Sequence, residues 1–484
     1  MNNLVSKSAV LSSLFWKLLE MGGIHAVGLF VQIVLARLLL PDNFGTIAIV
    51  LAFINIAQVF VQSGLSTALI QKQDADELDF STVFYASLAI AAFFYILLFV
   101  TAPLIANFYN DENLIRILRV MSLTLFFGAL KSIQNAYISK NMMFKRLFRI
   151  SLVSVLISGA AGIISAYMGL GVWALIIYYL TNGLVSVIIM LFKVEWRPAL
   201  IFSFQRLKSL FSFGGKLLVS SLIHTFYMDL RTLVIGRIYS PDALGYYNRG
   251  QSIPNTLTNA INGSVQAVML PTMSSMQDNE ASLKLVVRRS IKTTSFLIFP
   301  IMAGLAVVAE PIVSILLGDK WLPAVPFLQM FCLAAAFQML HTANLQAISA
   351  LGRSDIYLKL EIIKKIVGLA LLAVSIPFGI YAIAAGFAVS TIVDTLIHTF
   401  SNKDLYHYTA LEQSRDILPA LILSLTMGTA VYLLGLIKLP PWQLLFIQIP
   451  AGAVIYIALA KIFKVESWNY IINTAKEEMI RRKK

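Results

Sequence analysis

The sequence has little cysteine, little charge and none of the common hydrolytic motifs. Of its 484 residues one is cysteine and 13% are charged, whereas 58% are hydrophobic and the mean hydropathy is +0.79. The single cysteine, Cys332, excludes an intrachain disulfide and a cysteine cluster for metal. So few charged residues cannot cover the surface of a soluble domain of this length. The chain is therefore predicted to be an integral membrane protein.

Motifs for nucleotide hydrolysis and for hydrolytic catalysis are missing. The sequence contains no G-x-x-x-x-G-K-[ST] loop, no H-E-x-x-H and no G-x-S-x-G. Asp74-Ala-Asp76 resembles the D-x-D of some glycosyltransferases, but it stands in a short acidic connection that fits a solvated turn. No predicted connection is long enough to carry a catalytic domain. We therefore expect a protein that is not an enzyme and that needs no cofactor or metal.

Long apolar runs are what the sequence has in abundance. They extend for about 20 residues or more, which favours membrane-spanning helices over the alternating strands of a barrel. The predicted fold class is all-α integral membrane, with about fourteen transmembrane helices in two pseudo-symmetric six-helix lobes plus two C-terminal helices. The predicted spans are 14–38, 44–70, 81–106, 114–137, 147–168, 171–192, 213–238, 246–270, 291–317, 324–349, 356–377, 380–402, 417–437 and 442–463.

One sequence pattern occurs twice, each time between two apolar runs. A-R-L-L-L-P-D-N-F-G begins at Ala36, and G-R-I-Y-S-P-D-A-L-G begins at Gly236. Pro-Asp followed by Gly is a turn sequence, and its repetition predicts an internal duplication with a period of about 200 residues. The predicted parts are an N-terminal lobe (1–192), a cytoplasmic amphipathic linker (193–212), a C-terminal lobe (213–403), the last two spans (404–464) and a basic cytoplasmic tail (465–484).

Lysine and arginine gather in alternate connections between the spans. Most of the 38 basic residues fall on the side that carries both termini, which predicts that the N- and C-termini are cytoplasmic. The same distribution accounts for the net charge of +14 through anionic lipid headgroups. Nucleic acid is therefore not an expected partner.

Polar residues form stripes on four of the apolar spans. Burying an arginine near the bilayer centre costs about 2.5–3.5 kcal/mol on insertion scales, so a charged stripe is expected to face water or a partner. Asp229 points away from its span's stripe and suits a structural pair. The stripes comprise Lys17, Glu20, His25, Gly28 and Gln32; Asn55, Gln58, Gln62 and Ser66; Lys216, Ser220, His224, Tyr227 and Arg231; and Ser252, Asn255, Thr256, Asn259, Asn262, Gly263 and Gln266.

These stripes admit two interpretations. Amides within one span commonly serve helix packing, whereas stripes on equivalent spans of both lobes favour one aqueous cavity between the lobes. Lys131 either lines that cavity or extends to the membrane interface. Asp394 and His398, four residues apart, form either a paired couple or a proton-responsive site. The candidate ion-coupling residues are Glu20, Asp229, Asp394 and His398.

Two motifs carry a resemblance to a known family. The chain reads F-G-T-I-A-I-V-L-A-F from Phe44, after A-R-L-L-L-P-D, and D-A-L-G-Y-Y-N-R-G-Q-S-I-P from Asp242 to Pro254. With the six-plus-six-plus-two layout, these motifs resemble the polysaccharide-transporter branch of the MOP (multidrug/oligosaccharidyl-lipid/polysaccharide) superfamily. The similarity is to Wzx-type exporters associated with colanic and teichuronic acid, and it covers nearly the whole chain.

The resemblance implies a flippase for undecaprenyl-diphosphate-linked oligosaccharide repeat units in the bacterial cytoplasmic membrane. It implies alternating access around a central cavity, with the last two spans accommodating the lipid tail and with a polysaccharide polymerase and a chain-length regulator as partners. We expect Arg231 and Lys216, helped by His224 and Lys131, to bind the diphosphate. The other candidate substrate-binding residues are Tyr227, Lys17, His25, Asn55, Gln58, Gln62, Asn255, Asn259 and Gln266.

Two alternatives stay open at this point. A multidrug or other small-molecule exporter of the same superfamily would have a cavity rich in carboxylates and aromatic rings, whereas these stripes are basic and rich in amides. A membrane polysaccharide polymerase or ligase would need a sizeable external loop with catalytic residues.

Overall fold

The computed structural model of the chain describes residues 23–473 except His25, Ser63, Gln73, Ser275, Gln277, Asp278 and Lys438. The described residues form helices and no strand, so the predicted all-α class is confirmed. The candidate residues Lys17, Glu20 and His25 lie outside the described residues.

The described residues include 11 helices that are long and apolar enough to cross a membrane. The other predicted spans fall on the short apolar helix Ala26–Leu38, on α10 and on α14, which contain more polar residues. Each predicted span therefore overlaps a described helix, and residues 14–22 of the first span lie outside the described residues. The helices named below are α2 (Pro41–Gln62), α3 (Leu65–Gln71), α4 (Glu77–Tyr109), α5 (Asn113–Met121), α6 (Thr124–Lys140), α7 (Phe144–Tyr167), α8 (Val172–Lys193), α9 (Phe204–Ile238), α10 (Pro241–Ser274), α11 (Glu280–Val307), α12 (Ala309–Leu316), α13 (Val325–Ala350), α14 (Ser354–Ser375), α15 (Ile380–Tyr406), α16 (Ala410–Gly435) and α17 (Pro441–Ile462).

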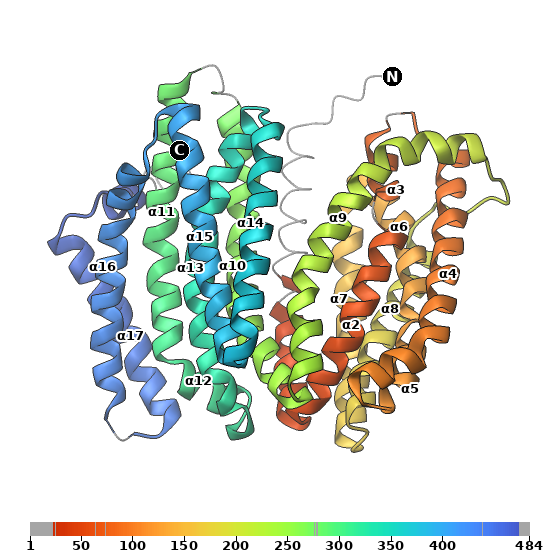
Figure 1. Cartoon of the computed structure of the whole chain (residues 1–484), viewed down its shortest axis with the longest axis horizontal. Helices are drawn as coiled ribbons and strands as arrows, with labels where there is room; N and C mark the ends of the chain where they lie inside the picture. The colour runs from red at the N-terminus through yellow and green to blue at the C-terminus, as the bar shows by residue number, and fades with distance from the viewer. Residues whose placement is uncertain are drawn as a thin grey trace. The chain divides into compact units, whose positions relative to one another are not determined.

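The chain divides into two compact units, Met1–Asn248 and Arg249–Lys484, so the division falls within α10. Figure 1 labels the helices of each unit. Compact units are defined by packing, whereas the predicted lobes are defined by the sequence duplication. The lobe boundaries at 192 and 213 therefore stay a prediction.

The two copies of the Pro-Asp-Gly turn contact each other within the first unit. A Cβ atom built on Gly45 would lie 1.8 Å from the carbonyl oxygen of Pro241, and one built on Gly245 would lie 2.2 Å from that of Pro41. Just beyond the other end of α2, a Cβ on Gly64 would lie 2.0 Å from the carbonyl oxygen of Gly214 in α9. The glycines therefore allow close backbone contact between the starts of α2 and α10 and between the residue after α2 and α9, and the reciprocal contact of the turns agrees with a duplication.

The segment between α8 and α9 is anchored to the start of α4. The backbone N–H of Ala199 donates to Ser81 Oγ over 3.1 Å, and that of Ser203 donates to Thr82 Oγ1 over 3.1 Å. Arg206 lies 3.4 Å from the carboxylate of Asp76, which caps α4; the hydrogen bond from the Asp79 backbone N–H is the largest cause that lowers the pKa of Asp76. The predicted linker 193–212 is thus an extended segment followed by the first turns of α9.

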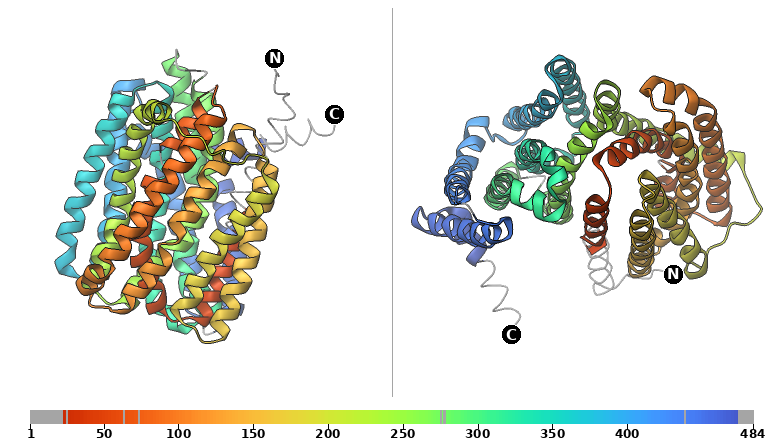
Figure 2. Two further views of the ribbon diagram at one scale, coloured as in Figure 1. Left: turned by 90° about the vertical axis from the view of Figure 1, so that its right-hand side faces the viewer. Right: turned by 90° about the horizontal axis from the view of Figure 1, so that it is seen from below.

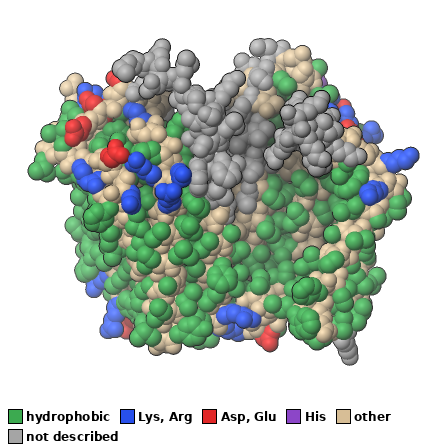
Figure 3. Space-filling view, turned by 180° about the vertical axis from the view of Figure 1, so that it is seen from behind, with side chains coloured by type: hydrophobic (Ala, Val, Ile, Leu, Met, Phe, Trp, Pro, Cys, Tyr) green, Lys and Arg blue, Asp and Glu red, His purple; other side chains and the backbone are tan. Residues whose placement is uncertain are grey.

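Many helices expose large apolar side chains on the surface of the protein. In Figure 3 hydrophobic side chains cover most of the visible face at mid-height, while most Lys, Arg, Asp and Glu side chains lie nearer its upper and lower ends. Figure 2 shows the helices of each unit side-on and from below. This arrangement is the one that a hydrocarbon slab between two aqueous phases requires.

Candidate substrate-binding site

The charged stripe of α9 becomes progressively more buried along the helix. Lys216 and His224 are exposed, Tyr227 is half-buried and Arg231 is only 5% exposed. The sequence predicted that the stripe would face water or a partner. The structure gives Arg231 a partner on its own helix.

Arg231 and Tyr227 form one interacting pair because they are four residues apart on α9. Nη2 of Arg231 donates to the hydroxyl of Tyr227 over 3.3 Å, and the guanidinium carbon lies 5.1 Å from the centroid of the tyrosine ring. The contact to Tyr227 uses one of the five N–H donors of the guanidinium, and Arg231 also interacts electrostatically with Tyr247. The ring therefore orients a cation within an apolar helix, where a phosphate group would meet little competition from water.

The polar stripe of α2 is divided among different surroundings. Asn55 Nδ2 donates to Asp229 Oδ2 of α9 over 3.3 Å, which is the kind of structural pair expected for Asp229. Gln58 packs onto α6, where a Cβ atom built on Gly128 would lie 1.5 Å from its Nε2. Gln62 is exposed. Asn55 and Gln62 are exposed, and of these two Asn55 is already engaged by Asp229.

The remaining predicted residues lie on α6 and α10. Lys131 is half-buried on α6. On α10, Asn255 is half-buried and Asn259 is exposed, and both belong to the second unit. The side chain of Gln266 lies outside the described residues. Thr256 donates its hydroxyl proton to a carbonyl of its own helix, so the amides are the groups of this stripe that suit an external ligand.

Asp394 and His398 differ in burial. Asp394 is half-buried, whereas His398 is fully buried and stacks on His341 of α13, with ring centroids 5.4 Å apart. The sequence favours a packing role for His341 and did not reveal its contact with His398, because the two lie 57 positions apart and no periodicity within one helix connects them. In the described part of the chain no three histidine, cysteine or acidic side chains gather as metal ligands would.

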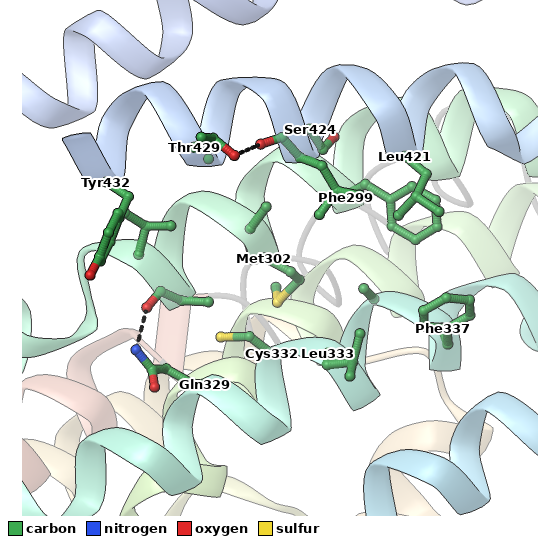
Figure 4. Close-up of a pocket in the computed structure, with 16 residues that line it drawn as sticks. Phe299, Met302, Gln329, Cys332, Leu333, Phe337, Leu421, Ser424, Thr429 and Tyr432 are labelled. Atoms are coloured by element: carbon green, nitrogen blue, oxygen red, sulfur yellow. Dashed lines mark hydrogen bonds between the residues drawn. The ribbon is translucent and has the colours of Figure 1, made fainter. Parts of the chain in front are cut away.

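Among the described residues of the second unit, apolar cavities lie on two different sides of α11. The first, of about 380 Å³, lies among α11, α13 and α16; Figure 4 shows Met302, Cys332 and Leu333 pointing into it and Gln329 bonded at its edge. The second, of about 520 Å³, is lined mainly by α11, α16 and α17, including Gly304, Met427 and Gly452. Such linings suit hydrocarbon chains and offer little to a sugar.

Solved structures with the same fold are membrane transporters. Lipid II flippase MurJ, in an inward closed conformation, matches with a TM-score of 0.77 at 17% identity, over 93% of this chain and 98% of its own. An inward-facing multidrug resistance MATE family transporter of the MOP superfamily matches with a TM-score of 0.62 at 13% identity, over 79% and 95%. At these identities the similarity shows the fold alone. The fold is that of the MOP-superfamily transporters.

Sequence similarity is more specific. The family described as "Polysaccharide biosynthesis protein" matches residues 34–326, more than half of the chain. The chain belongs to this family. Its relatives include the teichuronic acid biosynthesis protein TuaB of Bacillus subtilis, 24% identical over 83% of this chain and 85% of TuaB. The lipopolysaccharide biosynthesis protein WzxC of Escherichia coli is 23% identical over 81% of each chain, and the succinoglycan biosynthesis transport protein ExoT of Rhizobium meliloti is 26% identical over 68% and 67%.

Proposed function

We propose that this protein is a flippase for undecaprenyl-diphosphate-linked oligosaccharide repeat units. It moves them across the bacterial cytoplasmic membrane by alternating access, for export of an exopolysaccharide, lipopolysaccharide or capsule-type glycan. The family match over residues 34–326 carries the proposal, because the relatives named above serve the synthesis or transport of such glycans. The protein is a transporter and not an enzyme in this proposal.

The diphosphate is the part of this substrate that needs cations. Arg231 is buried and oriented by Tyr227, so it can bind a phosphate oxygen without first ordering its own side chain. Lys216 and His224 are exposed on the same helix and attract the diphosphate before it reaches Arg231. Within the same unit, the exposed amide of Gln62 supplies a hydrogen-bonding group for sugar hydroxyls.

The lipid tail needs an apolar surface that is open to the membrane. The cavity lined by α11, α16 and α17 has this character, and α16 and α17 are the last two predicted spans. A polyprenyl chain lying against Gly304 and Met427 would stay out of water while the head group crosses.

The multidrug-exporter alternative has support from the MATE fold similarity alone, at 13% identity. The basic stripe of α9 favours an anionic substrate instead. A polysaccharide polymerase and a chain-length regulator are the partners that we propose, together with membrane lipids.

Replacing Arg231 with glutamine tests the diphosphate assignment. The variant keeps a polar but shorter side chain and removes the charge, so we expect polysaccharide export to fall at least tenfold, about the effect of losing one charged hydrogen bond. Arg237→Gln is the matched control, because Arg237 is an exposed arginine on the same helix. Export is measured as secreted glycan at equal protein abundance. Normal export by Arg231→Gln at normal abundance would contradict the assignment.

The flippase activity itself is tested with purified protein in liposomes that contain a fluorescent undecaprenyl-diphosphate oligosaccharide. We expect the labelled head group to exchange between leaflets, and Arg231→Gln to slow the exchange. No exchange above protein-free liposomes, alongside efflux of a cationic dye, would favour the multidrug alternative.

Narrowing the cavity between α11, α16 and α17 tests where the tail lies. A Cβ atom built on Gly304 has only Met427 Cε nearby, at 3.8 Å, so Gly304→Leu can be accommodated while it fills the cavity. We expect slower exchange of long polyprenyl carriers and unchanged exchange of carriers with a short lipid. Ala306→Leu, which projects into the other apolar cavity, is the control. Equal slowing by both variants would show that this cavity is not specific for the tail.

A further inference from the structure

A polar pocket lies where α2, α5 and α8 begin, within the first unit. Figure 1 shows α5 at the lower end of that unit. The pocket has a volume of about 450 Å³, which is a usual size for a small-molecule site. Its polar and aromatic lining includes Asp42, Asn43, Asp111, Asn113, Arg116 and Trp173. This lining differs in kind from that of the apolar cavities beside α11.

The backbone around the polar pocket is fixed. Asn110 ends α4 in the left-handed conformation, and the backbone N–H of Asp111 donates to the carbonyl oxygen of Ala106 over 3.1 Å. Between α7 and α8, Gly169 and Gly171 have positive φ values of 76° and 55°. The helices α2, α5 and α8 pack against one another. A ligand therefore meets side chains whose backbone it does not have to order first.

The polar pocket has hydrogen-bond acceptors that its own residues leave unused. Asn43 donates through its backbone N–H, over 2.6 Å, and through its side-chain amide to Oδ1 of Asp42, which leaves Oδ2 of Asp42 available. The backbone N–H of Asn113 donates to Oδ1 of Asp111 over 3.0 Å and leaves Oδ2 of Asp111 available. Oδ1 of Asn43 is buried and has no hydrogen-bond partner among the described residues. Buried acceptors are nearly always satisfied in native proteins, so this one indicates a bound donor.

The same pocket has a strong donor and an apolar surface. Arg116 is exposed on α5, and among the described residues it has neither an ion pair nor a hydrogen bond. Trp173 is 37% exposed at the start of α8. An indole combines a large apolar surface with one N–H donor. Acceptors, donors and an aromatic ring therefore border one volume.

This lining distinguishes among three kinds of ligand. Arg116 would repel a divalent cation, and the described residues hold no group of three histidine, cysteine or acidic side chains. An anion would meet Asp42 and Asp111, two carboxylates against one guanidinium. A pyranose ring has hydroxyl groups that both donate and accept, and its C–H faces pack on aromatic rings. The lining therefore fits a neutral sugar best.

We propose that the polar pocket binds one neutral pyranose residue of a glycan on the outer side of the membrane. The connections 39–43, 107–113 and 169–170 lie on the side opposite both termini in the predicted topology. Asp42 and Asp111 accept hydrogen bonds from sugar hydroxyls, Arg116 donates to a sugar oxygen, and Trp173 packs on a C–H face. That this glycan is the one the protein transports rests on the proposed function.

Saturation-transfer NMR on the natural protein in lipid nanodiscs tests the site directly. The probes are the methyl glycosides of glucose, galactose, mannose and N-acetylglucosamine, with methyl glucuronide as the anionic comparison. We expect at least one neutral probe to bind, and the glucuronide to bind about tenfold more weakly because its carboxylate meets two others. No transfer to any neutral probe, or tighter binding of the glucuronide, would overturn the proposal.

Matched variants locate the binding. Arg116→Gln removes the guanidinium from the pocket, whereas Arg119→Gln changes an arginine of the same helix that donates to the carbonyl oxygen of Phe99. Trp173→Ala removes the indole, whereas Trp442→Ala removes another exposed tryptophan. We expect the two pocket variants to bind the neutral probe about tenfold more weakly and the two controls to bind it as the natural protein does. Equal binding by all four variants would show that the sugar lies elsewhere.

A fluorophore at the rim of the pocket distinguishes the sources of the sugar. It is attached to Glu112→Cys in a Cys332→Ala background, because Glu112 is exposed just before α5. Liposomes containing this protein receive either a free oligosaccharide or the same oligosaccharide on undecaprenyl diphosphate. A response to the free form identifies released glycan as the ligand, and a response to the lipid-linked form alone identifies the head group on its carrier. No response to either form, or a response to Ca²⁺ alone, would overturn the sugar site.

The two proposals fail in different ways. If the natural protein exchanges no lipid between leaflets but binds a neutral probe that both pocket variants lose, the proposed transport function is wrong and the sugar site stands. If the protein exchanges lipid while no neutral probe binds, the sugar site alone is wrong. If Trp173→Ala fails to fold, Arg116→Gln decides, because the side chain of Arg116 is exposed.

Discussion

Gly45 and Gly245 show how a single residue fixes the approach of two helices. Each carries its α-carbon against the carbonyl oxygen of the proline in the other turn, so a methyl group on either one would overlap the backbone. Backbone cannot yield as a flexible side chain can, which makes these positions intolerant of any substitution.

Alanine substitution tests this packing. We expect Gly45→Ala and Gly245→Ala each to lower the free energy of unfolding by about 1–3 kcal/mol through overpacking. Gly28→Ala is the control, since a Cβ atom on Gly28 would have no neighbour within 4 Å and alanine favours helix. Thermal unfolding in detergent, followed through intrinsic tryptophan fluorescence, provides the measurement. A Gly45→Ala protein as stable as the Gly28→Ala protein would show that the turns can separate at no cost.

Individual residues also show that a sequence pattern does not tell which neighbouring helix each side chain contacts. The α2 stripe was visible as one row of amides, yet Asn55 binds α9 and Gln58 packs on α6. A three- and four-residue periodicity identifies a shared face, but the face of one helix borders several neighbours.

At the scale of elements, one carboxylate joins α16 to α11. Asp416 has a side chain only 4% exposed, and it lies 2.5 Å from Nε of Arg288 and 3.2 Å from Nζ of Lys292. The hydroxyl of Tyr408 donates to the same carboxylate over 2.9 Å. The N-terminal halves of α11 and α16 and the connection that carries Tyr408 thus depend on a single buried negative charge.

Removing that charge should weaken the second unit. We expect Asp416→Asn to lower the free energy of unfolding by about 1–3 kcal/mol, because Arg288 and Lys292 lose a charged acceptor. Asp355→Asn removes the exposed partner of Arg353 and should cost less than about 1 kcal/mol. Limited proteolysis at increasing temperature distinguishes them. Equal resistance of the two variants would mean that the cations at this site find other partners.

At the scale of the whole molecule, the distribution of lysine and arginine predicts the orientation in the membrane. The buried Cys332 is the only cysteine, so a Cys332→Ala background allows single cysteines to be introduced. We expect Phe378→Cys to react with a membrane-impermeant maleimide in intact cells and Arg353→Cys to react only after the cells are opened. Both positions are exposed and lie in short connections. The reverse pattern would place the N- and C-termini outside the cytoplasm.

The sequence by itself determined the helices, the approximate spans, the repeated Pro-Asp-Gly motif and the family, because each of these depends on residues that are close in the chain or on a motif of fixed spacing. A run of apolar residues forms a membrane helix whatever surrounds it. The tertiary structure alone decided which side chains meet: Gln58 against Gly128, Asp416 among the cations of α11, and His341 on His398. These pairs come from distant helices, so only the way the helices pack, and no local pattern, could bring them together.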